Sequence, residues 1–330
     1  MRPFQPLFRN PHILTIVANF YPRKYDEAAF PRERRLIQTD PDTKVLVETQ
    51  HPRGEAKGHV VMVHGLEGSG ESGYIVSMAW AALNAGFITH RFHMRTCAGT
   101  ENHCKTLYHA GLTGDLRSFL TQVRADGGLE SELPIFLVGY SLGGNVVLKL
   151  AGELGETDLI QGVCGVSVPL VLARCTKRMQ DRDNLLYERR FVKRMKKRMV
   201  ATGRYTEAEL APLKTIWDID DRVTAPSFGF RGAAHYYETQ SAINFVPRIR
   251  VPALLIQAKD DTYIPFEMYS HPALAANPCI RLLTTEHGGH LGFLQRRGLP
   301  RFWLDGTVLE FLESHLQTPA AVGRNSQCGD

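Results

Sequence analysis

Several features that would assign the chain to other protein classes are missing from its 330 residues. It contains no G-x-x-x-x-G-K-[ST] motif, which excludes a P-loop nucleotide-binding site. The longest apolar stretch, about Gly162–Ala173, is too short to span a bilayer. The apolar run Ile13–Phe20 is also short, and it lacks a clean signal-peptide cleavage site.

Cysteine is sparse as well, and no two cysteines have C-x-x-C spacing. The six are Cys97, Cys104, Cys164, Cys175, Cys279 and Cys328. In a chain of this length, scattered cysteines predict reduced thiols in a reducing compartment. Together with the lack of an apolar span and of a leader segment, this pattern favours a soluble cytoplasmic protein.

The composition is that of a globular protein with a mild excess of positive charge. Hydrophobic residues make up 43% of the chain, which is enough to bury a sizeable core. The formal net charge is +5, and basic residues are densest in the segment Arg189–Arg198. Because the excess is concentrated there, it predicts a local basic patch rather than general nucleic-acid binding.

Strand-like and helix-like segments alternate along the chain, which predicts the α/β class. Apolar runs between turn residues predict strands over residues 44–49, 59–63, 87–92, 134–140, 162–168, 252–258 and 280–285. Runs with helical periodicity predict helices over residues 74–84, 113–125, 145–151 and 304–316. Such alternation is typical of a mostly parallel sheet with helices on both faces.

The alternation stops after Val168. Residues 169–248 are basic, aromatic and helical in pattern, and a core strand resumes only at Val251. An insertion of this length between two strands predicts a helical cap, or lid, over the functional site. We therefore expect an N-terminal arm (1–42), a core (43–168 and 249–317), a cap (169–248) and a disordered tail (318–330).

The most informative motif is Gly139-Tyr140-Ser141-Leu142-Gly143-Gly144. It follows a predicted strand and precedes a predicted helix, which is the context of a nucleophile elbow of the G-x-S-x-G type. The glycines allow a sharp turn at a strained serine and a close approach of neighbouring backbone. Ser141 is therefore the candidate nucleophile.

A serine nucleophile of this kind needs an acid and then a histidine later in the chain. Asp260 and Asp261 both follow the strand predicted over 252–258, and they compete for the role of the acid. Asp261, which lies four residues before Pro265, is the favoured acid. Alternation along an extended chain also means that only one of the two aspartates can point toward the site.

Two histidines compete for the role of the base. His287 and His290 lie in a glycine-rich loop after the last predicted strand, and His290 is favoured because Gly288 and Gly289 supply reach. His290 would accept the Ser141 proton and return it to the leaving group. The acid would hold the imidazole tautomer and stabilise the imidazolium.

The segment His59–Gly68 reads as a strand running into a glycine-rich loop. A serine hydrolase needs a second oxyanion donor at this place, so we assign the backbone N–H groups of Leu66 and Leu142 to the oxyanion hole. His64 beside this loop is expected to have a structural role.

Two other patterns in the sequence suggest alternative sites. Residues 68–73 spell G-x-G-x-x-G after a strand, which by itself suggests dinucleotide binding. The acid expected about 20 residues further on is missing, and dinucleotide binding would leave the elbow, the acid and the late histidine unexplained.

Between His90 and His109, six histidines and cysteines match no ligand template for zinc. We therefore expect neither a cofactor nor a metal.

The basic segment Arg189–Arg198 has helical periodicity. An apolar stripe recurs in it at i, i+4 spacing: Tyr187, Phe191, Met195 and Met199. The favoured reading is a cap helix that packs this stripe on the core and leaves a basic face in solvent. The alternative is weak contact with anionic lipid or an acidic substrate. Nucleic-acid binding is not expected, since no motif of a known module is interleaved.

Together these residues resemble the α/β-hydrolase fold and, more narrowly, the YheT-like, ABHD1/ABHD3-type (AB hydrolase 4) family. The narrower resemblance rests on the Asp261 and His290 loops and on these stretches: Phe8–Thr15, His64–Ser69, Gly139–Asn145, Asp218–Asp221, Ala225-Pro226, Gly229-Phe230 and Tyr236-Tyr237. It covers almost the full chain apart from the tail. It departs at Thr262, where a proline often follows the acid.

The resemblance implies a serine carboxylesterase or lipase that needs no cofactor, with Ser141, Asp261 and His290 as its triad. Its expected substrates are small-molecule or lipid esters with short- to medium-chain acyl groups, including acylglycerols. One alternative keeps the triad but is an acyltransferase, in which an alcohol or thiol other than water resolves the acyl-enzyme. A non-enzymatic binding protein on this fold is disfavoured because all three triad residues are present in order.

Overall fold

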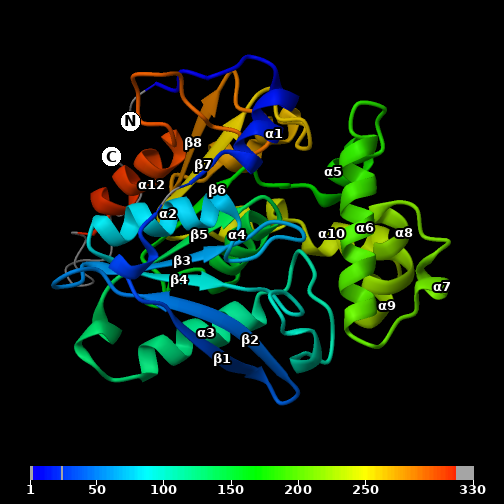
Figure 1. Ribbon diagram of the computed structural model, residues 1–330, viewed down its shortest axis with the longest axis horizontal. Coiled ribbons are helices and arrows are strands. Elements are labelled where there is room, and N and C mark those ends of the chain that lie inside the picture. The colour runs from blue at the N-terminus through cyan, green and yellow to red at the C-terminus, as the bar shows by residue number, and fades with distance from the viewer. Residues whose placement is uncertain (1–2, 24, 317–330) are drawn as a thin grey trace.

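The computed structural model describes residues 3–23 and 25–316 of the chain, built around an eight-stranded sheet (Figure 1). The strand order is β1-β2-β4-β3-β5-β6-β7-β8. The β1–β2 and β2–β4 pairs are antiparallel, and the remaining pairs are parallel. The predicted α/β class with a mostly parallel sheet is confirmed.

The strands are β1 (Glu33–Asp40), β2 (Thr43–Gln50), β3 (Gly58–Val63), β4 (Phe87–Phe92), β5 (Ile135–Tyr140), β6 (Gly162–Val166), β7 (Ala253–Ala258) and β8 (Ile280–Thr285). The helices around the sheet are α1 (Pro11–Phe20), α2 (Gly73–Asn84), α3 (Gly114–Ala125), α4 (Leu142–Leu154), α11 (Pro272–Ala276) and α12 (Trp303–Ser314). Between β6 and β7 lie α5 (Leu172–Met179), α6 (Leu185–Ala201), α7 (Glu207–Leu210), α8 (Ile216–Ile219), α9 (Ala225–Ser227) and α10 (Ala233–Gln240).

The central strands bury side chains on both faces, as β5 illustrates. Phe136 and Val138 of β5 pack in one core with α2 and α12. Ile135 and Leu137 point to the opposite face and pack in a second core with α3 and α4. Because both faces are covered, these strands read in the sequence as continuous apolar runs rather than as alternating ones.

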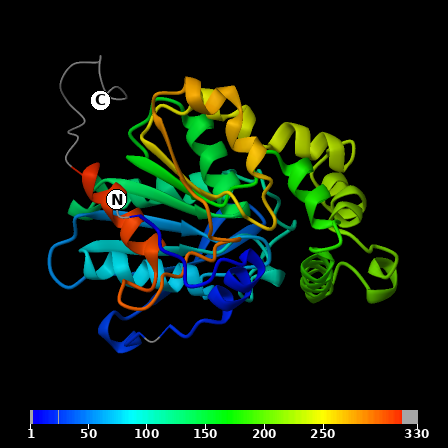
Figure 2. The ribbon, with the colours of Figure 1, turned by 90° about the horizontal axis from the view of Figure 1, so that it is seen from above.

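The helices α5 to α9 form a separate layer at one end of the sheet (Figures 1 and 2). They follow β6 and precede β7, and several of them share a small apolar core of their own. Within α6, Met195 and Met199 are buried in this core, whereas Phe191 is only partly buried. The layer lies at the end where the parallel strands terminate, so it faces the loop that carries Ser141.

Two elements near the beginning of the sequence are absent from the sequence-based prediction. The helix α1 begins after Asn10, whose side chain accepts the Ile13 N–H, and Pro11 occupies its first position. Its buried residues Leu14 and Ala18 pack against Leu294. The strand β1 adds an antiparallel edge to β2. Both elements fall in the stretch 1–42.

The cysteines correct one sequence-based expectation. Cys97, Cys104, Cys164 and Cys175 are free and buried. Cys279 is disulfide-bonded, so the prediction of reduced thiols throughout is wrong at this position.

Two other expectations concern the termini and membranes. The tail predicted over residues 318–330 lies outside the described residues. None of the helices in residues 3–23 and 25–316 combines the length and the apolarity that a bilayer crossing requires.

Candidate active site

Ser141 occupies a strained turn between β5 and α4. Its backbone has φ 51° and ψ −122°, in a region that residues with a side chain rarely adopt. The Ser141 N–H donates to the carbonyl oxygen of Val166 at 2.8 Å, which fixes the turn to the neighbouring strand β6. The strain is therefore held by the sheet, and it projects the hydroxyl beyond the end of β5.

The glycines of the motif are required by close packing. A Cβ atom at Gly139 would collide with the carbonyl oxygen of Gly143, and one at Gly143 would collide with the carbonyl oxygens of Val63 and His64. The turn thus sits directly against the end of β3. This contact brings the loop after β3 to the serine: a Cβ atom at Gly65 would lie only 3.1 Å from the Ser141 Cβ.

The three predicted triad side chains lie in one continuous contact. His290 Nε2 lies 3.0 Å from Ser141 Oγ. His290 Nδ1 lies 3.1 Å from each carboxylate oxygen of Asp261. The Asp261 carboxylate is wholly buried, and its Oδ1 also accepts the N–H groups of Tyr263 and Ile264. These bonds fix the carboxylate, and the carboxylate in turn orients the imidazole.

The less favoured alternatives, Asp260 and His287, form a pair of their own. Asp260 Oδ2 lies 3.1 Å from His287 Nδ1, and Asp260 Oδ1 accepts the Gly289 N–H at 2.9 Å. The two aspartates therefore diverge, and Asp260 fastens the loop that leads to His290. Neither Asp260 nor His287 has a hydrogen bond to Ser141 among those of residues 3–23 and 25–316.

A contact that sequence reasoning missed holds His290 from behind. The backbone N–H of His290 donates to Thr15 Oγ1 of α1 at 2.9 Å, and Thr15 Oγ1 donates to the Pro11 carbonyl at 2.8 Å. A Cβ atom at Gly289 would collide with these same Pro11 and Thr15 oxygens. Gly289 therefore allows the loop of His290 to pack tightly on α1.

The two amides assigned to the oxyanion hole are free to bind a ligand. Across the hydrogen bonds of the described ranges, neither the Leu66 N–H nor the Leu142 N–H has an acceptor. Leu142 is the first residue of α4, so its N–H belongs to the unsatisfied first turn of a helix. Leu66 lies in the loop that packs on Ser141.

His64 has the structural role expected of it. Its Nε2 accepts the Met94 N–H at 3.2 Å, so Nδ1 carries the proton and donates to the Gly65 carbonyl at 2.8 Å. Burial lowers the pKa of His64 to about 3, which keeps the ring neutral. A neutral His64 thus braces the loop that carries Leu66.

The same loop is held from the other side by two arginines of α6. The Glu67 backbone is left-handed, with φ 55°. Arg198 Nε and Nη2 lie 2.9 and 2.7 Å from Glu67 Oε1, and both side chains are buried. Arg194 donates to the Glu67 carbonyl oxygen, and Tyr108 Oη accepts the Glu67 N–H at 2.9 Å. Sequence reasoning did not single out this buried ion pair, which joins the helix α6 to the loop of Leu66.

A cavity of about 400 Å³ opens beside Ser141. Besides Ser141 and His290, its walls come from α1, from the loop after β3 and from α6. They include Ile16, Phe20, Leu66, Tyr187, Arg190, Phe191, Arg194, Tyr263 and Leu291. The Tyr263 ring packs on His290, with the ring centroids 4.3 Å apart. The wall is mixed, because polar side chains such as Ser69, Ser72 and Glu71 line it beside the apolar and aromatic ones. Such a wall is suited to an organic ligand that carries a polar group.

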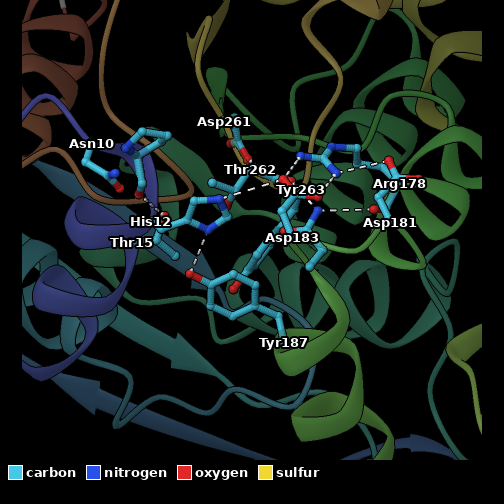
Figure 3. Close-up of polar contacts among 12 residues, drawn as sticks. Asn10, His12, Thr15, Arg178, Asp181, Asp183, Tyr187, Asp261, Thr262 and Tyr263 are labelled. Atoms are coloured by element: carbon cyan, nitrogen blue, oxygen red, sulfur yellow. Dashed lines mark hydrogen bonds and ion pairs between the residues drawn. The ribbon is translucent and has the colours of Figure 1, made fainter.

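Polar contacts join α1 and α6 at the rim of this cavity (Figure 3). His12 Nδ1 lies 3.2 Å from Tyr187 Oη, and the two rings stack. Asp183, just before α6, pairs with Arg178, and this contact lowers the Asp183 pKa to about 2. His12 Nε2 also lies 3.7 Å from Asp183 Oδ2, so these contacts connect α1 with the start of α6 next to the cavity-lining Tyr187.

The residues of the two alternative sites, the loop 68–73 and the segment from His90 to His109, form hydrogen bonds within the protein. In the loop 68–73, the Gly70 N–H donates to His93 Nδ1 and the Ser69 N–H to Ser72 Oγ. His90 bonds to Thr49 and to His59. In the part of the chain that the structure describes, no group of three or more His, Cys, Asp or Glu side chains could hold a metal ion.

Comparison with known proteins assigns the family of the chain. Residues 58–296 match the alpha/beta hydrolase fold family. The chain belongs to this family. It is 31% identical to the putative esterase YheT of Escherichia coli, over 94% of this chain and 92% of that protein. The resemblance to YheT-like proteins is confirmed.

Two further proteins extend the comparison. The chain is 24% identical to a monoacylglycerol lipase of Saccharomyces cerevisiae, over 78% of this chain and 60% of that protein. The structure of the Pyrococcus furiosus esterase Pf2001 superposes with a TM-score of 0.59 at 17% identity, over 89% of this chain and 97% of that one. At this identity, the structural likeness shows the fold alone.

Proposed function

We propose that the protein hydrolyses carboxylic esters through an acyl-enzyme on Ser141. The observation that carries this proposal is the unbroken contact from Asp261 through His290 to Ser141, at 3.1 and 3.0 Å. A serine hydroxyl is a weak nucleophile at neutral pH, and an adjacent base oriented by a third group activates it. The names of relatives, a putative esterase and a monoacylglycerol lipase, support the same reaction class.

The geometry suggests the following steps. Ser141 Oγ attacks the ester carbonyl carbon while its proton passes to His290 Nε2. The Leu66 and Leu142 amides donate to the oxyanion of the tetrahedral intermediate. His290 then gives the proton to the alkoxy oxygen, so that the alcohol leaves and the acyl group stays on Ser141. Water attacks the acyl carbon as His290 takes its proton, and the acid departs as that proton returns to Ser141.

We infer that the substrates carry short- to medium-chain acyl groups and include acylglycerols. The cavity of about 400 Å³ lies near the lower end of the range of small-molecule pockets, about 300–1,000 Å³. The apolar part of its lining offers Phe191 and Leu291 to an acyl chain. A neutral ester of a small alcohol needs no cofactor for this chemistry, since the attacking group and the proton carrier are both side chains.

The deciding experiment compares wild type with Ser141→Ala on p-nitrophenyl esters from acetate to palmitate. We expect kcat/KM to fall on the order of 10⁵-fold in the variant, because removing a triad member abolishes the nucleophilic route. We also expect the wild-type optimum to lie among the short and medium chains. Circular dichroism and thermal melting should show that Ser141→Ala keeps the fold.

Labelling with a fluorophosphonate gives an independent readout. The reagent should label wild type at one position and leave Ser141→Ala unlabelled. Wild-type rates in folded Ser141→Ala protein would refute the proposal.

A further inference from the structure

The exposed face of α1 carries large apolar side chains, whereas the exposed face of an ordinary surface helix is polar. Its buried side consists of Leu14, Thr15 and Ala18, which pack on the body of the protein. On the opposite side, Ile13, Ile16 and Phe20 are exposed, Phe20 at 66%. Large apolar side chains gathered on one exposed helix face mark an interaction surface more often than single exposed ones do.

The exposed side of α6 supplies the complementary feature. Leu186 is exposed at 77%, and Arg189, Arg190, Lys193 and Lys197 follow it at helical spacing. The single acidic residue of α6, Glu188, is buried. Every charged side chain that α6 exposes is therefore basic.

The apolar face and the basic face adjoin at the cavity of Ser141. The Arg190 guanidinium carbon lies 5.6 Å from the centre of the Phe20 ring. Ile16 and Phe20 of α1 and Arg190 and Arg194 of α6 line the cavity itself. Because Phe20 lines the cavity and is also largely exposed, the cavity reaches the surface between the two faces.

We propose that these faces form one docking surface for an anionic lipid bilayer, with the mouth of the cavity turned toward the membrane. The docking surface is defined by seven residues: Ile13, Ile16, Phe20, Leu186, Arg189, Arg190 and Lys193. Apolar side chains inserted at the level of the headgroups, with cations beside them, are the combination that binds amphipathic helices to anionic membranes. The surface would give the triad direct access to esters dissolved in the bilayer. That last step rests on the proposed function, whereas docking does not.

The first test measures binding without catalysis. Ser141→Ala protein is sedimented with vesicles of phosphatidylcholine alone or of phosphatidylcholine mixed with phosphatidylglycerol. We expect binding to the mixed vesicles that weakens as salt is raised, since the charges are exposed to solvent. Two double variants, Ile13→Ser/Leu186→Ser and Arg189→Gln/Lys193→Gln, should each weaken binding about tenfold or more.

Matched controls make the same types of substitution at exposed positions outside the docking surface. Leu129 is exposed in the loop before β5, and Arg35 and Lys44 are exposed on β1 and β2 at the far edge of the sheet (Figure 1). Leu129→Ser and Arg35→Gln/Lys44→Gln should bind like the parent. Equal losses in controls and docking variants, or no preference for phosphatidylglycerol, would overturn the proposal.

A second readout separates docking from catalysis. None of the four positions substituted in the double variants lines the cavity. With Ser141 intact, each double variant should therefore hydrolyse a soluble short-chain ester at the wild-type rate, but an ester carried in the vesicles more slowly. If soluble-ester hydrolysis is absent but vesicle binding persists, the proposed function fails and docking stands. Light scattering measures whether the protein is a dimer in solution. A dimer that Ile13→Ser/Leu186→Ser separates would show that a second copy covers the docking surface, and would overturn the proposal.

Discussion

Two aspartate–histidine pairs lie side by side after β7 and β8, and only one of them reaches the serine. The Asp261–His290 and Asp260–His287 contacts have the same length, 3.1 Å. His290 is 7% exposed and contacts Ser141, whereas His287 is 36% exposed and fastens the loop through Asp260. The same two residue types therefore serve different ends. The two pairs differ in two respects. Only His290 also contacts Ser141, and only the Asp261–His290 pair is shielded from water, which strengthens an interaction between charges.

Breaking the buried pair should have the largest effect. In Asp261→Asn, the amide no longer stabilises the imidazolium and favours the wrong tautomer, so we expect kcat to fall on the order of 10⁴-fold. The measurement is steady-state hydrolysis of a p-nitrophenyl ester, with Asp260→Asn as the matched control. Equal losses in the two variants would mean that the pairs are not functionally distinct.

The comparison extends to the other side of Ser141, where the buried Glu67–Arg198 pair holds the loop of Leu66. We expect Arg198→Met to lower the free energy of unfolding by about 3–5 kcal/mol, because Glu67 is left as an uncompensated buried charge. Urea unfolding measures this loss, and kcat should fall with it as the loop relaxes. The double variant Glu67→Gln/Arg198→Met should recover part of the stability. No recovery would show that packing, and not charge, accounts for the loss.

Removing the support behind His290 should have a smaller effect. Thr15→Val keeps the shape but deletes the acceptor of the His290 N–H, which costs about 1–2 kcal/mol. We expect kcat to fall by about tenfold at nearly constant KM, since the imidazole is displaced rather than removed. Thr15→Ser restores the hydroxyl and should recover the rate. A rate loss that Thr15→Ser does not reverse would contradict this positioning role.

The exposed pair should matter least. For His287→Ala we expect kcat/KM to change by less than about fivefold and stability by less than about 1 kcal/mol, because a partly exposed ion pair contributes little. Thermal melting and ester hydrolysis check both numbers. A collapse of activity in His287→Ala would instead place this pair within the reaction.

Sequence patterns were informative wherever a local signal was strong. The strand β5 and the turn at Ser141 could be predicted because six buried residues run into a glycine pattern that only a tight turn requires. The spacing of Asp261 from Pro265 favoured the aspartate that the structure brings to His290. The family assignment is confirmed, whereas the roles of the three side chains stay a prediction.

Other elements gave weak signals or none. The strand β1 is exposed at most of its positions, so its sequence lacks an apolar pattern. The helix α1 did carry a local signal, an Asn-Pro start followed by buried Leu14 and Ala18, which sequence reasoning did not use. The Glu67–Arg198 pair had no local signal, because its partners are 131 positions apart and meet only through the packing of α6.

The contact between Thr15 and His290 also determines when the site can form during synthesis. Its two residues are 275 positions apart, and Ser141 lies between them. A ribosome therefore releases the nucleophile long before the base, and the base meets its support only after all eight strands of the sheet have been synthesised. Contacts that close such long stretches of chain form late and slowly. A nascent chain would thus carry a serine with no means of activating it, so that catalytic competence arises as one of the last events of folding.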